Sequence, residues 1–243
     1  MRPTLVAFAA MDGLVRYSLD GPVATIAMDD GKVNALSPAM LAEIGGAFDR
    51  ARDERAAVVL CGRPGQFSAG FDLKVMRAGG ADAVEMIIAG FRLAEKILSH
   101  PAPVVIACTG NAVAMGSFLL LSGDHRIGAA GDFRIQANEV AIGLVMPHAA
   151  VELCRQRLTP AAFNRAVILA EQFTPEGAVT AGFLDEAVPA EDVIETARDA
   201  AVRFSQLNAE ALAGSKARTR RMALDAIAAG IDADEKGLRA LLG

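Results

Sequence analysis

GQFSAGFDLKVM, residues 65–76, follows the apolar run AAVVLCG at residues 56–62 after two intervening residues. A short, continuous apolar run of this kind predicts a buried strand. The stretch behind it gathers small residues at positions 68–70 and then becomes charged from Asp72 onward. Two functions account for small residues directly after a strand. One is a nucleophilic serine on a sharp turn, and the other is a loop whose backbone N–H groups face a ligand.

Strand and helix patterns alternate on both sides of this stretch. Residues 36–54 are predicted as a helix, with Ser37 as N-cap and Pro38 in the first helical position. A second, amphipathic helix is predicted over residues 81–100. The other predicted strands are two runs within residues 14–30, joined as a hairpin by Asp20-Gly21, and runs at residues 103–110, 124–136 and 184–188. This alternation predicts an α/β fold with parallel strands and right-handed crossovers.

The chain changes character from about Ala190, where it becomes rich in alanine and charged residues without any strand signal. We therefore divide it into a core, residues 1–190, and a helical C-terminal region, residues 191–243. This region is predicted to be either a lid on the core or an oligomerisation arm. Val193, Ala197 and Val202 form an apolar stripe on a charged helix, and such a stripe needs a partner surface. We therefore expect this region to take part in an oligomer.

Composition excludes several classes of protein. The chain has 243 residues, 53% of them hydrophobic, which is enough for a large core. The formal net charge is −5, which argues against nucleic acid or an anionic membrane as a partner. Uninterrupted apolar runs stay far below the ~18 residues of a membrane span.

The cysteines and the first residues bear on the compartment. Cys61, Cys108 and Cys154 have no metal-ligand spacing and lie in apolar surroundings, so we expect buried free thiols, a reducing compartment and no metal. The opening MRPTLVAFAAMDG, residues 1–13, imitates a signal peptide, but its apolar part is too short and is followed by Asp12. A cytoplasmic location is therefore predicted.

A nucleophilic serine is not supported. A serine elbow needs glycine two residues before and two after the serine, whereas Ser68 lies between Gln66 and Gly70 in these positions. Ser117 lies between Met115 and Leu119 and fails as well. The histidines also lie outside any recognised motif; they are His100, His125 and His148.

The backbone-amide interpretation is stronger. A second loop of small residues, AVAMGS at 112–117, follows the second buried strand just as residues 68–71 follow the first. Two such loops at the carboxyl ends of neighbouring strands would form an oxyanion hole with two donors. The spacing alone leaves open the alternative that both loops are simply tight strand–helix turns.

Three blocks in this order, FSAGFDLK (67–74), GNAVAMGSFLLLSGDHRI (110–127) and NEVAIGLVMP (138–147), resemble the crotonase superfamily, the enoyl-CoA hydratases and isomerases. The resemblance runs from Val33 to the helical tail. It implies a crotonase-like spiral of ββα units with a C-terminal helical region that builds trimers, so we expect a homotrimer or a dimer of trimers. It also implies an acyl-CoA substrate, with coenzyme A as part of the substrate and no further cofactor.

The resemblance assigns roles to residues of the two loops. The amide of Phe71 is one oxyanion donor, and that of Met115 is the second, unless a shift of one residue transfers the role to Gly116. The family more often has alanine at position 71 and glycine at 115. Met115 at positive φ would cost about 1–2 kcal/mol, and two bulky side chains would narrow the acyl pocket unless they point away. Substrate contacts are predicted for Ser68, Ala69, Gly70, Asp72, Leu73, Lys74, Gly116 and Phe118.

The resemblance also distinguishes between reactions. Hydratases of the family use two glutamates, and the first of these positions holds Phe118 here. The second matches Glu139, and a single glutamate in this place resembles the Δ3,Δ2-enoyl-CoA isomerases. Taken alone, Glu139 is better explained as a solvated or N-cap carboxylate that opens a turn. As a base it would need apolar walls that raise its pKa, and we expect these from Val140, Ile142, Leu144 and Phe118.

Other functions stay open at this point. They are an enoyl-CoA hydratase with an unidentified water-activating group, a catalytically silent acyl-CoA-binding protein, and an oligomeric scaffold. Because coenzyme A is anionic, its predicted partners are Lys32, Lys74 and Arg77. The basic run KARTRR at residues 216–221 is expected either to reach a neighbouring subunit's coenzyme A through Lys216 or to cover the helix surface.

Overall fold

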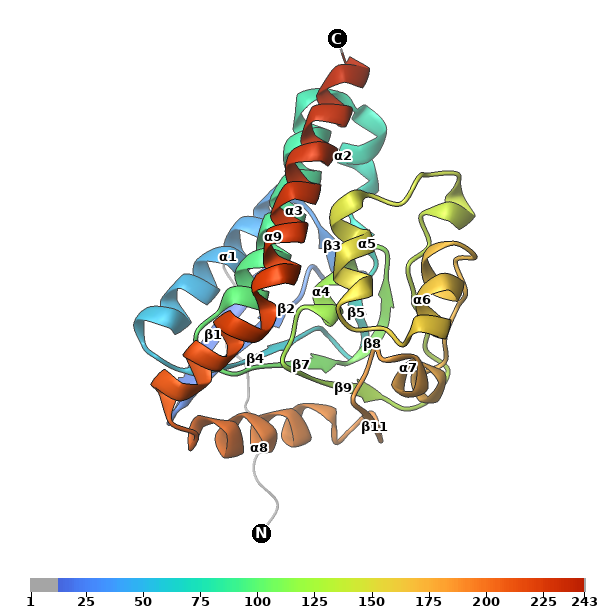
Figure 1. Cartoon of the computed structure of the whole chain (residues 1–243). Helices are drawn as coiled ribbons and strands as arrows, with labels where there is room; N and C mark the ends of the chain where they lie inside the picture. The colour runs from blue at the N-terminus through green and yellow to red at the C-terminus, as the bar shows by residue number, and fades with distance from the viewer. Residues whose placement is uncertain (1–12, 243) are drawn as a thin grey trace.

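The computed structural model describes residues 13–242, and its helices lie on both faces of a central sheet (Figure 1). The segment weighed above as an export signal therefore lies almost entirely outside the described residues. Among residues 13–242, no helix combines the length and the apolar character needed to span a bilayer.

The large sheet has the strand order β1-β2-β4-β7-β9-β11. The hairpin predicted at Asp20-Gly21 is present as an antiparallel pair, and all other neighbours in the sheet are parallel. All residues of the central strands β4 and β7 are buried, as their apolar runs predicted. The strands are β1 (Val15–Asp20), β2 (Val23–Met28), β4 (Ala57–Cys61), β7 (Val104–Cys108), β9 (His125–Ala129) and β11 (Glu186–Val188).

A small parallel sheet, β10-β8-β5, stands beside the large one. Each of its strands follows a strand of the large sheet: β5 (Gly65–Ser68) follows β4, β8 (Gly110–Val113) follows β7, and β10 (Ile135–Gln136) follows β9. A third pair joins β3 (Ala35–Leu36) to β6 (Gly70–Phe71). Helical segments come after each strand pair, so the predicted spiral of ββα units is confirmed.

Helices cover the sheet from two sides (Figure 1). On one side α1 (Pro38–Asp53), α3 (Gly80–Ser99) and α9 (Ala209–Leu242) lie together, with α9 packed along α3 and α5 (His148–Arg155). On the other side α8 (Val193–Ser205) packs against β4, β7 and β9. The remaining helices are α2 (Leu73–Ala78), α4 (Met115–Leu121), the 3₁₀ helix η1 (Val140–Ile142), α6 (Pro160–Val167) and α7 (Pro175–Ala181).

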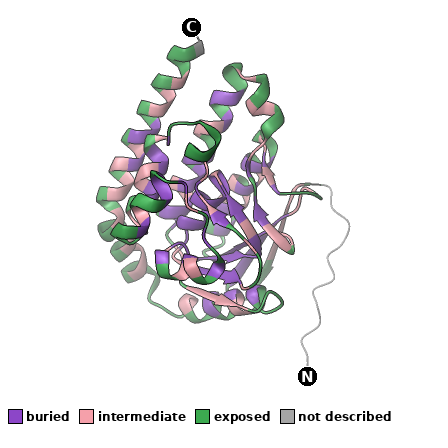
Figure 2. Cartoon of the chain, turned by 90° about the vertical axis from the view of Figure 1, so that its right-hand side faces the viewer, coloured by how far each residue is buried: buried purple, intermediate pink, exposed green. Residues whose placement is uncertain are grey.

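Two apolar cores result, one on each face of the sheet. The buried residues are purple in Figure 2. Strand β4 alternates between them, since Val58 and Leu60 belong to the first core and Val59 and Cys61 to the second. The three cysteines are buried free thiols, as predicted.

The expected partner surface for α8 is found within the same chain. Val193 and Ala197 are fully buried in the core between α8 and the sheet, whereas Val202 is 44% exposed. On α9, Ile227 and Ile231 are buried in the first core. The apolar stripe therefore gives no support to an oligomer, and the assembly stays a prediction.

The segment at residues 111–123 was wrongly predicted. Instead of a loop followed by a short apolar run, the chain forms β8 and then α4, all of whose residues are buried. A helix buried on every side has no amphipathic period, so its sequence lacked the usual helix signal.

Candidate active site

Three segments meet at one edge of the small sheet. Because β5, β8 and β10 are parallel, their carboxyl ends, Ser68, Val113 and Gln136, lie at the same edge. The N–H of Ala114 donates to the carbonyl of Gln136 at 2.9 Å, which ties the second of these segments to the third. Ligands of α/β proteins commonly bind beyond the carboxyl ends of parallel strands.

The first segment turns at Gly70, which adopts φ +89°. Ser68 stabilises this turn, since its hydroxyl donates to the carbonyl of Asn34 at 2.7 Å and accepts the N–H of Gly70 at 3.1 Å. A Cβ atom on Gly70 would lie only 2.8 Å from Cβ of Ala114 and 3.2 Å from the backbone nitrogen of Met115. The two predicted oxyanion loops therefore touch each other.

The amide of Phe71 points away from strand β3. The next amide, that of Asp72, donates to Leu36 of β3 at 3.4 Å. Successive N–H groups of a strand point to opposite sides, so that of Phe71 lies outside this ladder.

In the second segment the residue with positive φ is Ala114. The strain that we considered for Met115 is therefore on the preceding residue. Ala114 has φ +50° and ψ −130° and directly precedes α4. Met115 and Gly116 are the first residues of that helix, where amides have no acceptor within the helix. A Cβ atom on Gly116 would lie 2.5 Å from the carbonyl oxygen of Ser68. The first turn of α4 thus abuts the end of β5.

The third segment holds Glu139, three residues beyond the end of β10. This side chain is only 7% exposed, and its Oε2 has no hydrogen-bond partner. It occupies the N-cap position of η1 but makes no capping hydrogen bond. Burial raises the pKa of Glu139 to about 7. Both ordinary explanations, a solvated carboxylate and a helix cap, are therefore excluded.

Most of the residues that we expected to form apolar walls around Glu139 do not enclose it. Val140, Ile142 and Leu144 are 42%, 59% and 48% exposed. Neighbours along the chain turn outward here because η1 is a single tight turn. Burial raises the pKa of the Cys154 thiol of α5, and the charge of Glu139 adds to this, so at least one group near the carboxylate comes from a distant segment.

Comparison with known proteins agrees with this geometry. A family model described as enoyl-CoA hydratase/isomerase matches residues 19–241. The chain belongs to the enoyl-CoA hydratase/isomerase family. The predicted crotonase resemblance and the prediction of an enzyme of this superfamily are thereby confirmed.

Relatives in this family carry different names. The crystal structure of an enoyl-CoA hydratase from Mycobacterium marinum is 47% identical and covers 95% of this chain and 100% of its own, with a TM-score of 0.89. The human mitochondrial Δ3-Δ2-enoyl-CoA isomerase is 27% identical over 95% of this chain and 92% of its own, with a TM-score of 0.88. A curated relative, carnitinyl-CoA dehydratase of Salmonella arizonae, is 29% identical over 86% of this chain and 81% of its own.

The residues predicted to contact substrate in this enoyl-CoA hydratase/isomerase differ in their exposure. Ala69, Leu73 and Lys74 are exposed and accessible to a ligand. Asp72 is the N-cap of α2, where its side chain accepts the N–H of Lys74 at 2.7 Å. The others are buried; they are Ser68, Gly70, Gly116 and Phe118.

The expected basic partners of coenzyme A also divide. Lys32, Lys74 and Arg77 are exposed. The side chain of Lys216 is only 12% exposed, and it is bound within its own chain to the carbonyl of Ala102 at 3.0 Å and to Asp124 at 2.7 Å. The expectation that this lysine reaches a neighbour's coenzyme A therefore stays a prediction, whereas Arg218 and Arg221 of the same run are exposed on α9.

Sequence reasoning missed residues that support the oxyanion loops. Asn34 is fully buried with φ +51°, and its side-chain amide donates to the carbonyls of Met28 and Phe67, both at 3.1 Å. Its place in VNALS, at the start of the family resemblance, was the available signal. Gly90 of α3, which lies against Phe71 and Met115, had no signal in the sequence.

A cavity of about 540 Å³ lies between α1, α2 and α3. Its lining is mainly apolar, with two carboxylates; the residues are Pro38, Leu41, Ala42, Val75, Asp82, Glu85, Met86 and Ala89. Within residues 13–242, His, Cys, Asp and Glu form no group of three that could hold a metal ion.

Proposed function

We propose that this chain is a Δ3,Δ2-enoyl-CoA isomerase that works with Glu139 as its single acid–base group. The observation that carries the proposal is the buried, unpartnered carboxylate of Glu139, with its pKa of about 7, in a chain that has Phe118 at the other acid–base position. A carboxylate with a pKa near the working pH both accepts and returns a proton efficiently. The name of the human relative, a Δ3-Δ2 isomerase, agrees with this proposal.

The reaction moves one proton and one double bond. Glu139 removes a proton from C2 of a 3-enoyl-CoA, and the electron pair of the C–H bond passes into a dienolate whose negative charge rests on the thioester oxygen. The protonated Glu139 then delivers the proton to C4. The C=O bond of the thioester re-forms, and the double bond has moved from between C3 and C4 to between C2 and C3. Substrate and product have the same composition, so we propose that no cofactor is needed beyond the coenzyme A of the substrate.

The enolate needs donors that are in place before the reaction. In the proposal the amides of Phe71 and Met115 supply them, and the contact between Gly70 and the start of α4 supports this assignment. Loss of one such donor typically costs about 10²–10³ in kcat.

We propose that the cavity between α1, α2 and α3 receives the acyl chain. Val75 of α2 follows Phe71 by four residues, and the lining is mainly apolar. Asp82 and Glu85 would repel the phosphates of coenzyme A. These would lie instead near the exposed cations Lys32, Lys74 and Arg77.

The decisive assay offers a 3-enoyl-CoA and a 2-enoyl-CoA side by side and follows isomerisation and hydration together. Glu139→Gln should lower kcat for isomerisation by about 10²–10⁴, with KM nearly unchanged, because the amide keeps the size but cannot take a proton. Exposed Glu176→Gln is the matched control. An active Glu139→Gln variant would refute the mechanism. Acyl-CoA binding without turnover by the unmutated protein would identify a silent binding protein instead.

Hydration is the second candidate function. Besides Glu139, the neighbouring Asn138 has a buried Oδ1 without a partner, and two such acceptors could orient one water molecule. The names of the Mycobacterium marinum hydratase and the carnitinyl-CoA dehydratase agree with this alternative. Hydration faster than isomerisation in the paired assay would favour it.

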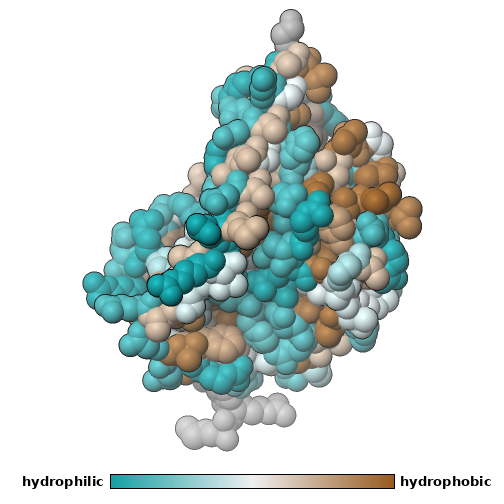
Figure 3. Space-filling model, in the orientation of Figure 1, coloured by the Kyte–Doolittle hydropathy of each residue, from teal (hydrophilic) through white to brown (hydrophobic). Residues whose placement is uncertain are grey.

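We also propose a homotrimer or a dimer of trimers in the cytoplasm. Exposed apolar side chains in and after η1 support an assembly, foremost Val145, which is 92% exposed. Brown spheres gather at the upper right of Figure 3, where Figure 1 places η1 and the segment leading to α5. A monodisperse monomer in light scattering at micromolar concentration would refute the assembly.

A further inference from the structure

Gly90 lies in the middle of α3, where the helical backbone does not require a glycine. It is buried, and glycine is less favourable than alanine in a helix interior. Its occurrence there is explained by what surrounds it. A Cβ atom on Gly90 would lie 2.5 Å from Cε1 and 2.6 Å from Cζ of Phe71. The same atom would lie 3.5 Å from Cγ of Met115.

The side chains of both proposed oxyanion residues therefore meet at one position of α3. The ring of Phe71 packs edge-on against Phe91, with centroids 6.3 Å apart and planes at 77°. Phe91 in turn lies 6.1 Å from Phe118. Met115 is fully buried. Phe71 itself is only partly buried. With Phe91 on one side, a ring displaced by an added atom on α3 therefore moves toward its exposed side.

We infer that Gly90 is a positioning residue for the oxyanion hole, because it leaves the space in which the side chains of Phe71 and Met115 dock on α3. A ring displaced from this space must either rotate toward the ligand side or shift the backbone of Phe71. Either movement disturbs a donor amide, and a misplacement of about 1 Å can cost 10²-fold in rate. The inference rests on the proposed function, since it takes the two amides as the enolate donors.

A double-mutant cycle tests the inference. Gly90→Ala should lower kcat/KM for isomerisation by about 10- to 100-fold, mainly through kcat. In a Phe71→Ala background the same substitution should lower it by less than about threefold, because the ring that Cβ would strike is gone. Gly46→Ala is the matched control. Gly46 is an exposed glycine of α1 with no heavy atom within 4 Å of its Cβ position, so activity should stay unchanged.

A second readout separates this inference from the proposed reaction. Acetoacetyl-CoA forms an enolate that absorbs in the near ultraviolet, so its bound enolate reports donor geometry without turnover. We expect Gly90→Ala to weaken this signal in the original background and much less in Phe71→Ala. If the unmutated protein binds the enolate but does not isomerise an enoyl-CoA, the proposed function is refuted. The double-mutant cycle, measured by enolate binding, then still tests the role of Gly90.

Three results would overturn the inference. One is an equal effect of Gly90→Ala in both backgrounds, and another is no effect on kcat or enolate binding. Both would leave Gly90 with a purely structural role, visible only in thermal stability. The third is an unmutated protein that neither turns over an enoyl-CoA nor binds the enolate, which would refute the oxyanion hole itself.

Discussion

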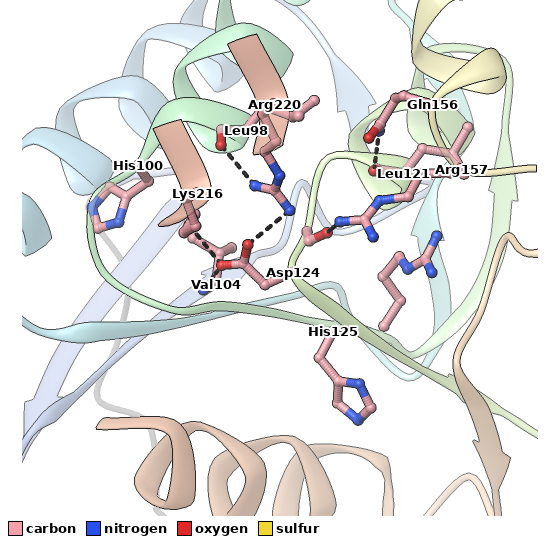
Figure 4. A network of polar contacts seen from close by, with 12 residues as sticks. Leu98, His100, Val104, Leu121, Asp124, His125, Gln156, Arg157, Lys216 and Arg220 are labelled. Carbon is pink, nitrogen blue, oxygen red and sulfur yellow. Dashed lines mark hydrogen bonds and ion pairs between the residues drawn. The ribbon is translucent and has the colours of Figure 1, made fainter. Parts of the chain in front are cut away.

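Asp124, the residue before β9, binds Lys216 of α9 across the interior of the protein, with 2.7 Å between Oδ2 and Nζ (Figure 4). The same carboxylate binds Arg220 at 2.8 Å and accepts the N–H of Val104 at 2.7 Å. The side chains of Asp124, Lys216 and Arg220 are 20%, 12% and 11% exposed. This cluster therefore ties α9 to the amino ends of β7 and β9.

Replacing Asp124 should loosen this connection. Asp124→Asn would leave Lys216 and Arg220 without their carboxylate in a largely buried place, and we expect a loss of about 2–4 kcal/mol in the free energy of unfolding. Asp232→Asn is the matched control, since Asp232 also joins α9 to α3 through Arg92 at 2.8 Å but is 72% exposed. Its loss should stay below about 1 kcal/mol. Equal losses of the two variants in urea denaturation would contradict this prediction.

Glu139 should make the stability of the protein depend on pH. Its pKa is about 7 in the folded protein, against an ordinary value of 4.5. Between these values the folded protein holds a proton that the unfolded chain has released, so stability falls as pH rises through this window. The total decrease is about 3 kcal/mol at 1.36 kcal/mol per pKa unit.

The Glu139→Gln variant removes this titration. Relative to the unmutated protein, it should become more stable by about 2–3 kcal/mol between pH 5 and pH 8. Exposed Glu176→Gln should leave the pH profile of urea denaturation unchanged. If the stability of Glu139→Gln and of the unmutated protein depends on pH in the same way, ionisation of Glu139 does not destabilise the folded protein, and the prediction is wrong.

Signals that lie within a few residues predicted the fold well. Ser37 caps α1 and accepts the N–H of Met40 as expected, and the Asp20-Gly21 turn joins β1 and β2. The buried strands β4 and β7 were equally visible as short apolar runs. Such signals are predictive because capping and turn geometry depend on the local backbone.

Features that depend on distant segments escaped prediction. The strain at Ala114 arises where β8 passes into α4 beside β10, and the burial of Glu139 depends on segments far along the chain such as α5. Neither position shows this in its own neighbours. The stripe of Val193 and Ala197 correctly indicated a buried face, but the sequence could not tell a partner subunit from the chain's own sheet. The spacing of apolar residues along a helix does not show which surface covers them.

Phe118→Glu should introduce a second carboxylate where hydratases of the family are expected to have one. We expect measurable addition of water to a 2-enoyl-CoA. Because Phe118 is 1% exposed, the variant should also lose about 2–4 kcal/mol of stability. Phe118→Gln has the same size but no proton to exchange and is the matched control. If folded Phe118→Glu, checked by circular dichroism, hydrates no faster than Phe118→Gln, position 118 does not face the substrate.

Gly70→Ala should disturb the candidate oxyanion hole through a steric contact with α4, in addition to straining the backbone. Gly70 has φ +89°, and Gly21 in the β1–β2 turn has φ +55°, so alanine at either position should cost about 1–2 kcal/mol in conformational strain. Only at Gly70 does the new Cβ also meet other atoms, at 2.8 Å from Cβ of Ala114, whereas the space at Gly21 is open within 4 Å. The strand end and the start of α4 must then separate, which moves the amides of Phe71 and Met115 apart. We therefore expect Gly70→Ala to lose about 10²-fold or more in kcat for isomerisation. Gly21→Ala should keep its activity, although strain lowers its free energy of unfolding by a similar amount. Equal activities of the two folded variants would show that the contact between Gly70 and α4 does not set the donor geometry.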